Sequence, residues 1–375
     1  MSYNKGCVTS RSMPFWCVGN RLSDPFGGPV LDQQDSLETA KIIAWAGREG
    51  YIEATAYHDD DLVPWDPAHP DDDLDPKRDV YKKLREIKNI LDKDGVTVNS
   101  SICNLHGDKM FRDGGLCNPD PEIRQLARLK VERTLRLGQF FGAKYYVYWV
   151  ARDGFEVPVC TDWKNVYDWL AEGLNNVSSY IKTNGMKNYV GATIEPKPNE
   201  PRGQMFLPTS GHAAGFIYGK LDDPDFWGVN PELLQHESMA LLNAVMTVGY
   251  LCSMNKLKFL HFGSQIKAQF DNDFPPLIGP EGLKETVTMF HALNQIGWKG
   301  TVEFDCHMLR SEGDPADSTA ARKEFIVNCS TALEMALQLS ERIENPKSGL
   351  SQSAADLISV QQMCRLEKID PRRRK

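Results

Sequence analysis

The stretch that decides the fold is residues 189–203, YVGATIEPKPNEPRG. Its apolar first part, 189–194, is short and β-branched, which is typical of a buried strand. Glu195 and Lys197 follow two residues apart and point to the same side of an extended chain. Prolines at 196, 198 and 201 end any ladder pairing. A carboxylate and an ammonium at the mouth of a buried strand predict a metal and substrate site; a surface ion pair is the alternative.

Short β-rich runs alternate with longer amphipathic runs on both sides of this stretch. The expected strands are 14–18, 51–57, 96–103, 144–150, 189–194, 226–229, 257–262 and 301–304. The helical periodicity predicts helices over 36–48, 77–93, 121–141, 162–183, 237–254, 281–296 and 318–342. The chain is therefore expected to be built from repeated strand–helix units.

A glycine stands shortly before several of these strands, as at the C-cap of a preceding helix: Gly50, Gly95, Gly142, Gly185 and Gly300. No GxGxxG motif follows the first strand, which removes the main support for a dinucleotide-binding sheet. Eight alternating units instead predict an α/β fold, the closed (β/α)8 TIM barrel. We expect one catalytic domain over residues 1–345 and a short C-terminal extension over 346–375, where the composition loosens.

Composition excludes several classes of partner. The net charge of −8 does not favour binding to a negatively charged phosphate backbone, so a nucleic acid is not expected as a partner. The nine cysteines are odd in number and form no CxxC pair, which favours a reduced compartment and a cytoplasmic location. No apolar run is long enough to cross a membrane, and no membrane partner is expected.

Acidic and imidazole side chains gather just after the expected strands, where the active sites of (β/α)8 barrels lie. They are His58, Asp61, Glu195, Lys197, Glu232, His236, His261, Asp271, Asp273, Asp305 and His307. Other strands are followed by tryptophan or asparagine, at Trp16, Asn104, Trp149 and Asn230. Carboxylates crowded together repel one another, and a bound cation would compensate them.

Oxygen-rich ligands with one or two imidazoles suit Mg²⁺, Mn²⁺ or Co²⁺. The candidate ligands exceed six, which predicts two divalent cations that share a bridging carboxylate and polarise two neighbouring substrate oxygens. Each residue taken alone has another reading. An aspartate after a strand can cap a helix, His58 can be a surface imidazole, and a tryptophan can belong to the core. Their joint placement favours the cation site.

Four motifs resemble the xylose isomerase family over about residues 10–345. They are His58-Asp59-Asp60-Asp61-Leu62, Ile194-Glu195-Pro196-Lys197-Pro198-Asn199-Glu200-Pro201-Arg202-Gly203, Gly228-Val229-Asn230-Pro231-Glu232 and Phe270-Asp271-Asn272-Asp273. Asp24-Pro25-Phe26-Gly27 adds support. The resemblance implies a homo-oligomer, a dimer or tetramer, that converts an aldose to its ketose with two divalent cations.

The resemblance also implies a role for each matching position. Glu195, Glu232 and Asp305 match ligands of the metal that holds the sugar hydroxyls. Glu232 matches a bridge to a second metal, whose other ligands match His236, Asp271 and Asp273. His58, steadied by Asp61, matches the residue that assists ring opening, and Lys197 matches the lysine on the carbonyl oxygen. The expected substrate contacts are Trp16, Phe26, Trp149, Asn230 and His307, of which Phe26 matches a residue that reaches into a neighbouring subunit's pocket.

The sequence departs from the family pattern at several of these positions. His236 follows Glu232 by four positions, where the family pattern has a spacing of three. His261 stands where the family carries an aspartate ligand, which removes one negative charge and favours Mn²⁺ or Co²⁺ over Mg²⁺. His307 stands where a lysine is usual, and His106 where a phenylalanine is usual.

These observations leave three hypotheses. The leading one is a metal-dependent aldose–ketose isomerase acting on D-xylose or a related aldose by a 1,2-hydride shift. A second keeps the barrel and uses His261 and His307 for proton abstraction, as in an epimerase or lyase. A third is a barrel that binds a sugar or a metal without turnover.

Overall fold

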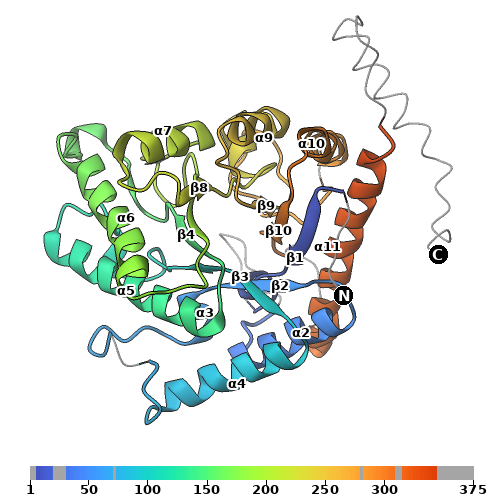
Figure 1. Cartoon of the computed structure of the whole chain (residues 1–375), viewed down its shortest axis with the longest axis horizontal. Helices are drawn as coiled ribbons and strands as arrows, with labels where there is room; N and C mark the ends of the chain where they lie inside the picture. Colours follow the sequence, from blue (N-terminus) through green and yellow to red (C-terminus); the bar gives the residue numbers. More distant parts are fainter. Residues whose placement is uncertain (1–5, 20–30, 71–72, 279–281, 309–314, 344–375) are drawn as a thin grey trace, which may run out of the picture.

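Eight parallel strands form the centre of the molecule in the computed structural model, which describes residues 6–19, 31–70, 73–278, 282–308 and 315–343 (Figure 1). The strands are β1 (Val8–Ser12), β2 (Ala54–His58), β3 (Thr97–Ile102), β4 (Tyr145–Trp149), β6 (Gly191–Glu195), β8 (Trp227–Val229), β9 (Leu260–Phe262) and β10 (Gly300–Phe304). They pair in the order β8-β6-β4-β3-β2-β1-β10-β9. Parallel bridges from Val229 to Leu257 and from Glu232 to His261 join the two ends of this order. The predicted (β/α)8 barrel is therefore confirmed.

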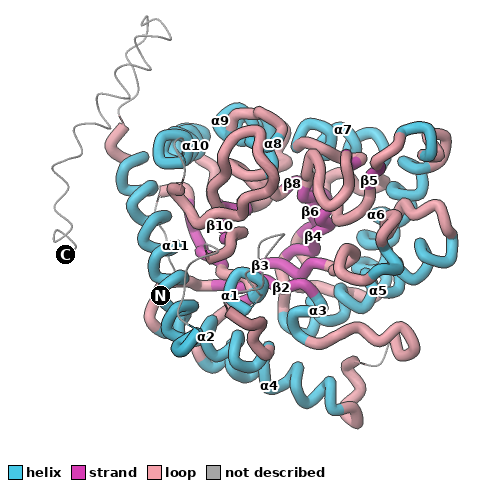
Figure 2. The backbone as a smooth tube through the Cα atoms, turned by 180° about the vertical axis from the view of Figure 1, so that it is seen from behind, coloured by secondary structure: helices cyan, strands magenta, loops and turns pink. Residues whose placement is uncertain are grey.

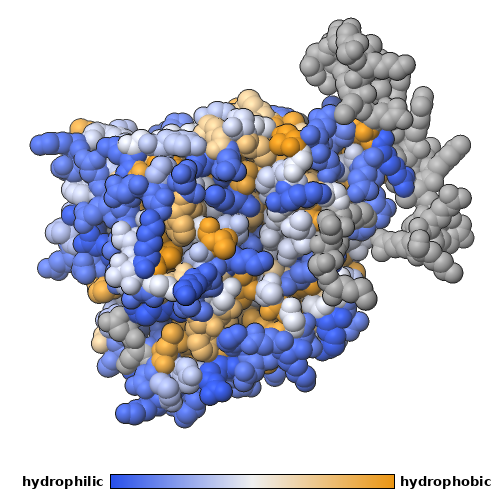
Figure 3. Space-filling model, viewed as in Figure 1, coloured by the Kyte–Doolittle hydropathy of each residue, from blue (hydrophilic) through white to orange (hydrophobic). Residues whose placement is uncertain are grey.

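Helices surround the strands (Figure 1). The longer ones are α2 (Ser36–Arg48), α4 (Asp79–Lys93), α5 (Pro121–Phe141), α6 (Val166–Thr183), α7 (Ser210–Lys220), α9 (Ala244–Ser253), α10 (Gly282–Ile296) and α11 (Ser318–Ser340). Local sequence explains their ends: the Asp35 and Asp120 side chains cap α2 and α5, and Gly142 closes α5 with a φ of 78°. On the side that Figure 3 shows, most of the surface around the rim is hydrophilic, as expected for amphipathic helices.

The predicted strand over 14–18 is wrong. Residues 15–18 lie in the short helix α1 (Phe15–Gly19). The first strand is β1, which begins at Val8. Pro14 has no N–H to donate, so it does not suit a barrel strand that is paired on both edges. The true strand contains Ser10, Arg11 and Ser12, whose polarity hid it; Arg11 is paired with Glu53 at 2.6 Å.

Three other predictions need correction. The helix predicted over 237–254 is two helices, α8 (His236–Met239) and α9, because Leu241 has a φ of 61° and Asn243 caps α9. Helix α7 was not predicted; it is short, and its buried apolar residues include two small alanines, Ala213 and Ala214, beside Phe216 and Ile217. Gly300 lies in β10, and the positive φ that ends the preceding helix belongs to Gly297. The predicted extension, 346–375, lies outside the described residues.

The loops that follow the strands gather at one end of the barrel. Figure 2 shows the short helices α1 and α8 and several loops over the middle of the ring. The helix α3 (Asp59–Leu62) follows β2. Two short strands, β5 (Gly154–Phe155) after β4 and β7 (Gln204–Met205) after β6, pair antiparallel. Among the helices that the structure describes, none is long and apolar enough to cross a membrane.

Candidate active site

A small polar cavity opens at the strand ends. Its volume is about 240 Å³, well below the roughly 300–1,000 Å³ of sites for drug-sized ligands. The lining residues are Trp16, His58, Asp61, Ile102, Asn104, His106, Trp149, Glu195, Lys197, Glu232, His236, Asp271, Asp273, Asp305 and His307. Most of the residues predicted from the strand ends are thus brought to one place. The cavity suits a small, hydroxyl-rich molecule.

One group of ligand atoms lies on β6, β9 and the end of β10. Glu195, His261 and Asp305 each offer an atom to a common point. The Nδ1 atom of His261 lies 2.9 Å from Asp305 Oδ2 and 3.3 Å from Glu195 Oε2. Trp16 donates its indole N–H to the other oxygen of Asp305 at 2.7 Å. The buried imidazole therefore stands between two carboxylates.

A second group lies beside the first, after β8 and β9. Glu232, Asp271 and Asp273 converge there, and Glu195, Glu232 and His236 also converge. His236 Nε2 lies 2.5 Å from Glu232 Oε2 and 3.4 Å from Asp271 Oδ2. Its Nδ1 lies 3.0 Å from the carbonyl oxygen of Pro196, which can only accept, so Nδ1 carries the proton and Nε2 faces the acids. Glu195 belongs to the first group as well, so it links the two groups.

The electrostatics of these groups fit bound cations. Burial and the nearby acids raise the pKa of Glu232 to about 8, and burial beside Asp271 raises the pKa of Asp273 well above its usual range. One oxygen each of Glu232 and Asp271 is buried without a hydrogen-bond partner. Without a cation, the cluster retains protons that carboxylates normally lose. A divalent cation would replace those protons and engage the unpartnered oxygens.

Lys197 lies in the cavity beside His236, and both side chains contact the same oxygen of Asp271, Oδ2. Burial lowers its pKa, but the charge and hydrogen bond of Asp271, 2.5 Å away, more than offset this, and the net shift is upward. The ammonium lies 5.5 Å from the centre of the Trp149 ring. Lys197 is therefore a fixed hydrogen-bond donor with a positive charge, and it does not act as a base.

Aromatic and imidazole rings form a wall of the cavity. The Trp16 and His58 rings lie 4.6 Å apart, and His106 lies 5.4 Å from His58 and 4.7 Å from Trp149. Asp61 accepts the backbone N–H of His58 at 2.8 Å and lies 3.4 Å from its Nδ1. Burial lowers the pKa of His58, but the contact with Asp61 more than offsets it and raises the pKa overall.

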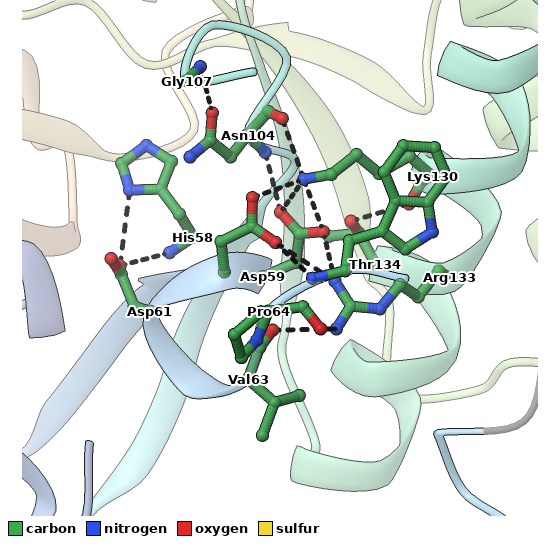
Figure 4. A network of polar contacts seen from close by, with 12 residues as sticks. His58, Asp59, Asp61, Val63, Pro64, Asn104, Gly107, Lys130, Arg133 and Thr134 are labelled. Carbon is green, nitrogen blue, oxygen red and sulfur yellow. Dashed lines mark hydrogen bonds and ion pairs between the residues drawn. The ribbon is translucent and has the colours of Figure 1, made fainter. Parts of the chain in front are cut away.

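A buried ion network holds His58 in place (Figure 4). Asp59, fully buried, accepts hydrogen bonds from Lys130 at 2.9 Å, Arg133 at 2.7 Å and the backbone N–H of Asn104 at 2.8 Å. Lys130 also donates to the Asn104 carbonyl oxygen at 2.8 Å. Helix α5 thereby ties the end of β2 to the end of β3. The acidic residues after β2 therefore have different partners: Asp61 faces the cavity, and Asp59 faces helix α5.

Some predicted residues are placed differently from the rest. Asn230 does not line the cavity; it is buried and donates to Glu195 at 3.3 Å. Phe26 lies outside the described residues. His307 lines the cavity, 3.7 Å from Asp273. Glu303, fully buried beneath His261, was not predicted, because a single acid inside an otherwise apolar strand gives no local sign of its partners.

Comparisons with known proteins agree with the fold. A family model described as xylose isomerase-like TIM barrel matches residues 51–329. The chain is similar to a xylose isomerase of Thermus thermophilus, with 36% identity over 299 residues, 80% of this chain and 73% of that protein.

Two solved structures share the fold at low sequence identity. A putative xylose isomerase from Rhodospirillum rubrum aligns with a TM-score of 0.61 at 13% identity, over 86% of this chain and 99% of that one. A D-psicose 3-epimerase aligns with a TM-score of 0.58 at 14% identity, over 87% and 99%. At these identities the two structures support the fold alone.

Proposed function

Because the chain belongs to the xylose isomerase-like TIM barrel family, we propose that it is a metal-dependent sugar isomerase that interconverts an aldose and its ketose. The substrate would be D-xylose or a related aldose. One observation carries the proposal: a single small cavity combines two groups of metal-type ligands with a buried ammonium, Lys197. The sequence identity to a xylose isomerase favours the same reaction class.

Two divalent cations would be held by the chain's own carboxylates and imidazoles. Glu195, His261 and Asp305 would hold one, and Glu232, His236, Asp271 and Asp273 the other. Bound Mn²⁺, Mg²⁺ or Co²⁺ would hold and polarise two neighbouring oxygens of the sugar. An imidazole in each group favours Mn²⁺ or Co²⁺ over Mg²⁺.

The remaining residues transfer protons, donate hydrogen bonds to the substrate and exclude water. His58, paired with Asp61, takes the proton of the anomeric hydroxyl and passes it to the ring oxygen as the ring C–O bond breaks, which opens the cyclic sugar. Lys197 donates a hydrogen bond to the carbonyl oxygen while a hydrogen moves between the two adjacent carbons. Trp16 and Trp149 cover the reacting carbons and keep water away from them.

His307 favours a second candidate, an epimerase that acts by proton abstraction. Burial lowers its pKa, so the imidazole is neutral, and its Nδ1 is buried without a hydrogen-bond partner. A neutral imidazole in the cavity could take a proton from a carbon beside a carbonyl group. The lysine usual at this position in the family could not do so as an ammonium.

An isotope experiment tests the proposal and separates the two candidates. The protein with Mn²⁺ is incubated in ordinary water with aldoses deuterated at C2, and the products are followed by NMR. A hydride shift predicts a ketose that retains deuterium at C1, and Lys197→Met, which lacks the donor, should reduce its rate about 10²–10³-fold.

Two outcomes would contradict the isomerase. A product that has exchanged its deuterium for solvent hydrogen would favour proton abstraction. Sugar binding without any product would favour a non-catalytic barrel.

The homo-oligomer and the cytoplasmic location stay predictions. The expected contact of Phe26 with a neighbouring subunit falls outside the described residues.

A further inference from the structure

Glu303 is a buried acid that the proposed reaction does not use. It lies on β10, directly below the cavity, with no exposed surface. It pairs across the barrel interior with side chains of three other strands, β1, β3 and β9. A carboxylate placed so deep requires a compensating set of donors.

Those donors are all present. One carboxylate oxygen accepts hydrogen bonds from Ser12 Oγ at 2.7 Å and Asn99 Nδ2 at 2.9 Å. The other accepts from Ser100 Oγ at 2.6 Å and lies 3.1 Å from Nε2 of His261. A carboxylate can only accept, so Nε2 of His261 carries a proton. The second ring nitrogen, Nδ1, is then the one that faces Glu195 and Asp305.

We infer that Glu303 is a positioning residue that fixes the tautomer of His261, so that Nδ1 is the atom offered to a divalent cation between Glu195 and Asp305. The inference rests on the proposed cation site. His236 is oriented in the opposite sense, because the Pro196 carbonyl holds its Nδ1 and leaves Nε2 for the acids. The two imidazoles therefore need two different partners.

Glu303 also compensates the charge of this ligand. A neutral imidazole ligand carries no negative charge. The Glu303 carboxylate supplies one on the far side of the ring and makes the imidazole a stronger electron-pair donor to a cation. A carboxylate behind a histidine ligand typically changes metal affinity about 10–100-fold.

The test is the binding of Mn²⁺ to the metal-free protein, measured by the electron paramagnetic resonance of the free ion. The wild-type protein should bind two Mn²⁺. Glu303→Gln keeps the shape of the side chain and removes its charge, and it should weaken one Mn²⁺ at least 10-fold. The other Mn²⁺, bound near Asp271 and Asp273, should be unchanged, which also reports that the barrel is folded.

Two controls separate orientation of the ligand from a structural role. Glu285→Gln changes another buried acid, which accepts hydrogen bonds from Asn243 and Ala244, and it should leave both affinities within twofold. In a His261→Ala background there is no imidazole to orient, so Glu303→Gln should change Mn²⁺ binding less than twofold. If the role of Glu303 were purely structural, Glu303→Gln would lower the thermal stability and leave both Mn²⁺ affinities at their wild-type values.

If Glu303→Gln does not fold, the tautomer of His261 can still be measured directly in the wild-type protein. ¹⁵N NMR of the Mg²⁺-loaded wild-type protein, with the His261 signal assigned by its loss in His261→Ala, should show a proton on Nε2. A proton on Nδ1, or two unchanged Mn²⁺ affinities in Glu303→Gln, would overturn the inference while the cation site stands. A wild-type protein that binds no Mn²⁺ would overturn the proposed site instead.

Discussion

His236 and His261 face neighbouring groups of carboxylates with opposite ring nitrogens. Each is fixed by an acceptor behind it, the Pro196 carbonyl for His236 and the Glu303 carboxylate for His261. An imidazole ligand therefore depends on more than one position, because the ring must also be oriented. His261 can be singled out from the sequence, whereas its partner Glu303 is recognised only in the fold.

The pair of His58 and Asp61 leads to a prediction about pH. Asp61 raises the pKa of His58 against the opposing effect of burial. In Asp61→Asn the charge is gone and burial dominates, so the pKa of His58 should fall below the usual value of about 6.5. The titration of its Cε1–H signal by NMR in the metal-free protein measures this.

Asp60→Asn is the matched control for that titration. Asp60 faces Lys130 and Arg133, and its removal should leave the pKa of His58 nearly unchanged. A pKa of His58 that stays raised in Asp61→Asn would show that the charge of another carboxylate, such as Asp59 or Asp305, stabilises its protonated form.

At the scale of elements, the end of β2 is tied to helix α5 by buried charges. Lys130 and Arg133 lie one turn apart on α5, and both reach Asp59. The sequence predicts α5 with its bounds, because an aspartate and a proline open it and a glycine closes it. It does not predict that the interior of this helix carries two buried cations, since a charged residue on a helix ordinarily faces water.

Asp59→Asn should strongly destabilise the barrel. It leaves Lys130 and Arg133 buried without the carboxylate that balances them, which typically costs about 3–5 kcal/mol in the free energy of unfolding. The two cations lower the pKa of Asp59 against the effect of burial. Its contribution is therefore present above the unfolded-state pKa of about 3.9 and is lost as the pH falls through the lower folded-state pKa.

Urea unfolding at several pH values checks this prediction. The difference in the free energy of unfolding between wild type and Asp59→Asn should be largest near neutral pH and should become smaller below about pH 4. Asp60→Asn, at a partly exposed site beside it, should cost about 1 kcal/mol or less. Equal costs for the two variants at neutral pH would contradict the central role given to Asp59.

At the scale of the whole molecule, the barrel was predictable because its strands and helices alternate with clear local signals. Seven of the eight barrel strands begin within the expected runs or one residue before them. The first strand was missed because its polar residues are satisfied by partners elsewhere, and the break between α8 and α9 depends on backbone conformation. Glu303 was missed because Ser12, Asn99 and Ser100 are more than 200 residues away along the chain.

The most direct test of the central claim is a crystal of the protein soaked in Mn²⁺ and measured for anomalous scattering. Two peaks are expected at the barrel mouth. One should lie at bonding distance from Glu195, His261 Nδ1 and Asp305, and the other from Glu232, His236, Asp271 and Asp273. No peak at either group, or a first peak that His261 does not contact, would contradict it.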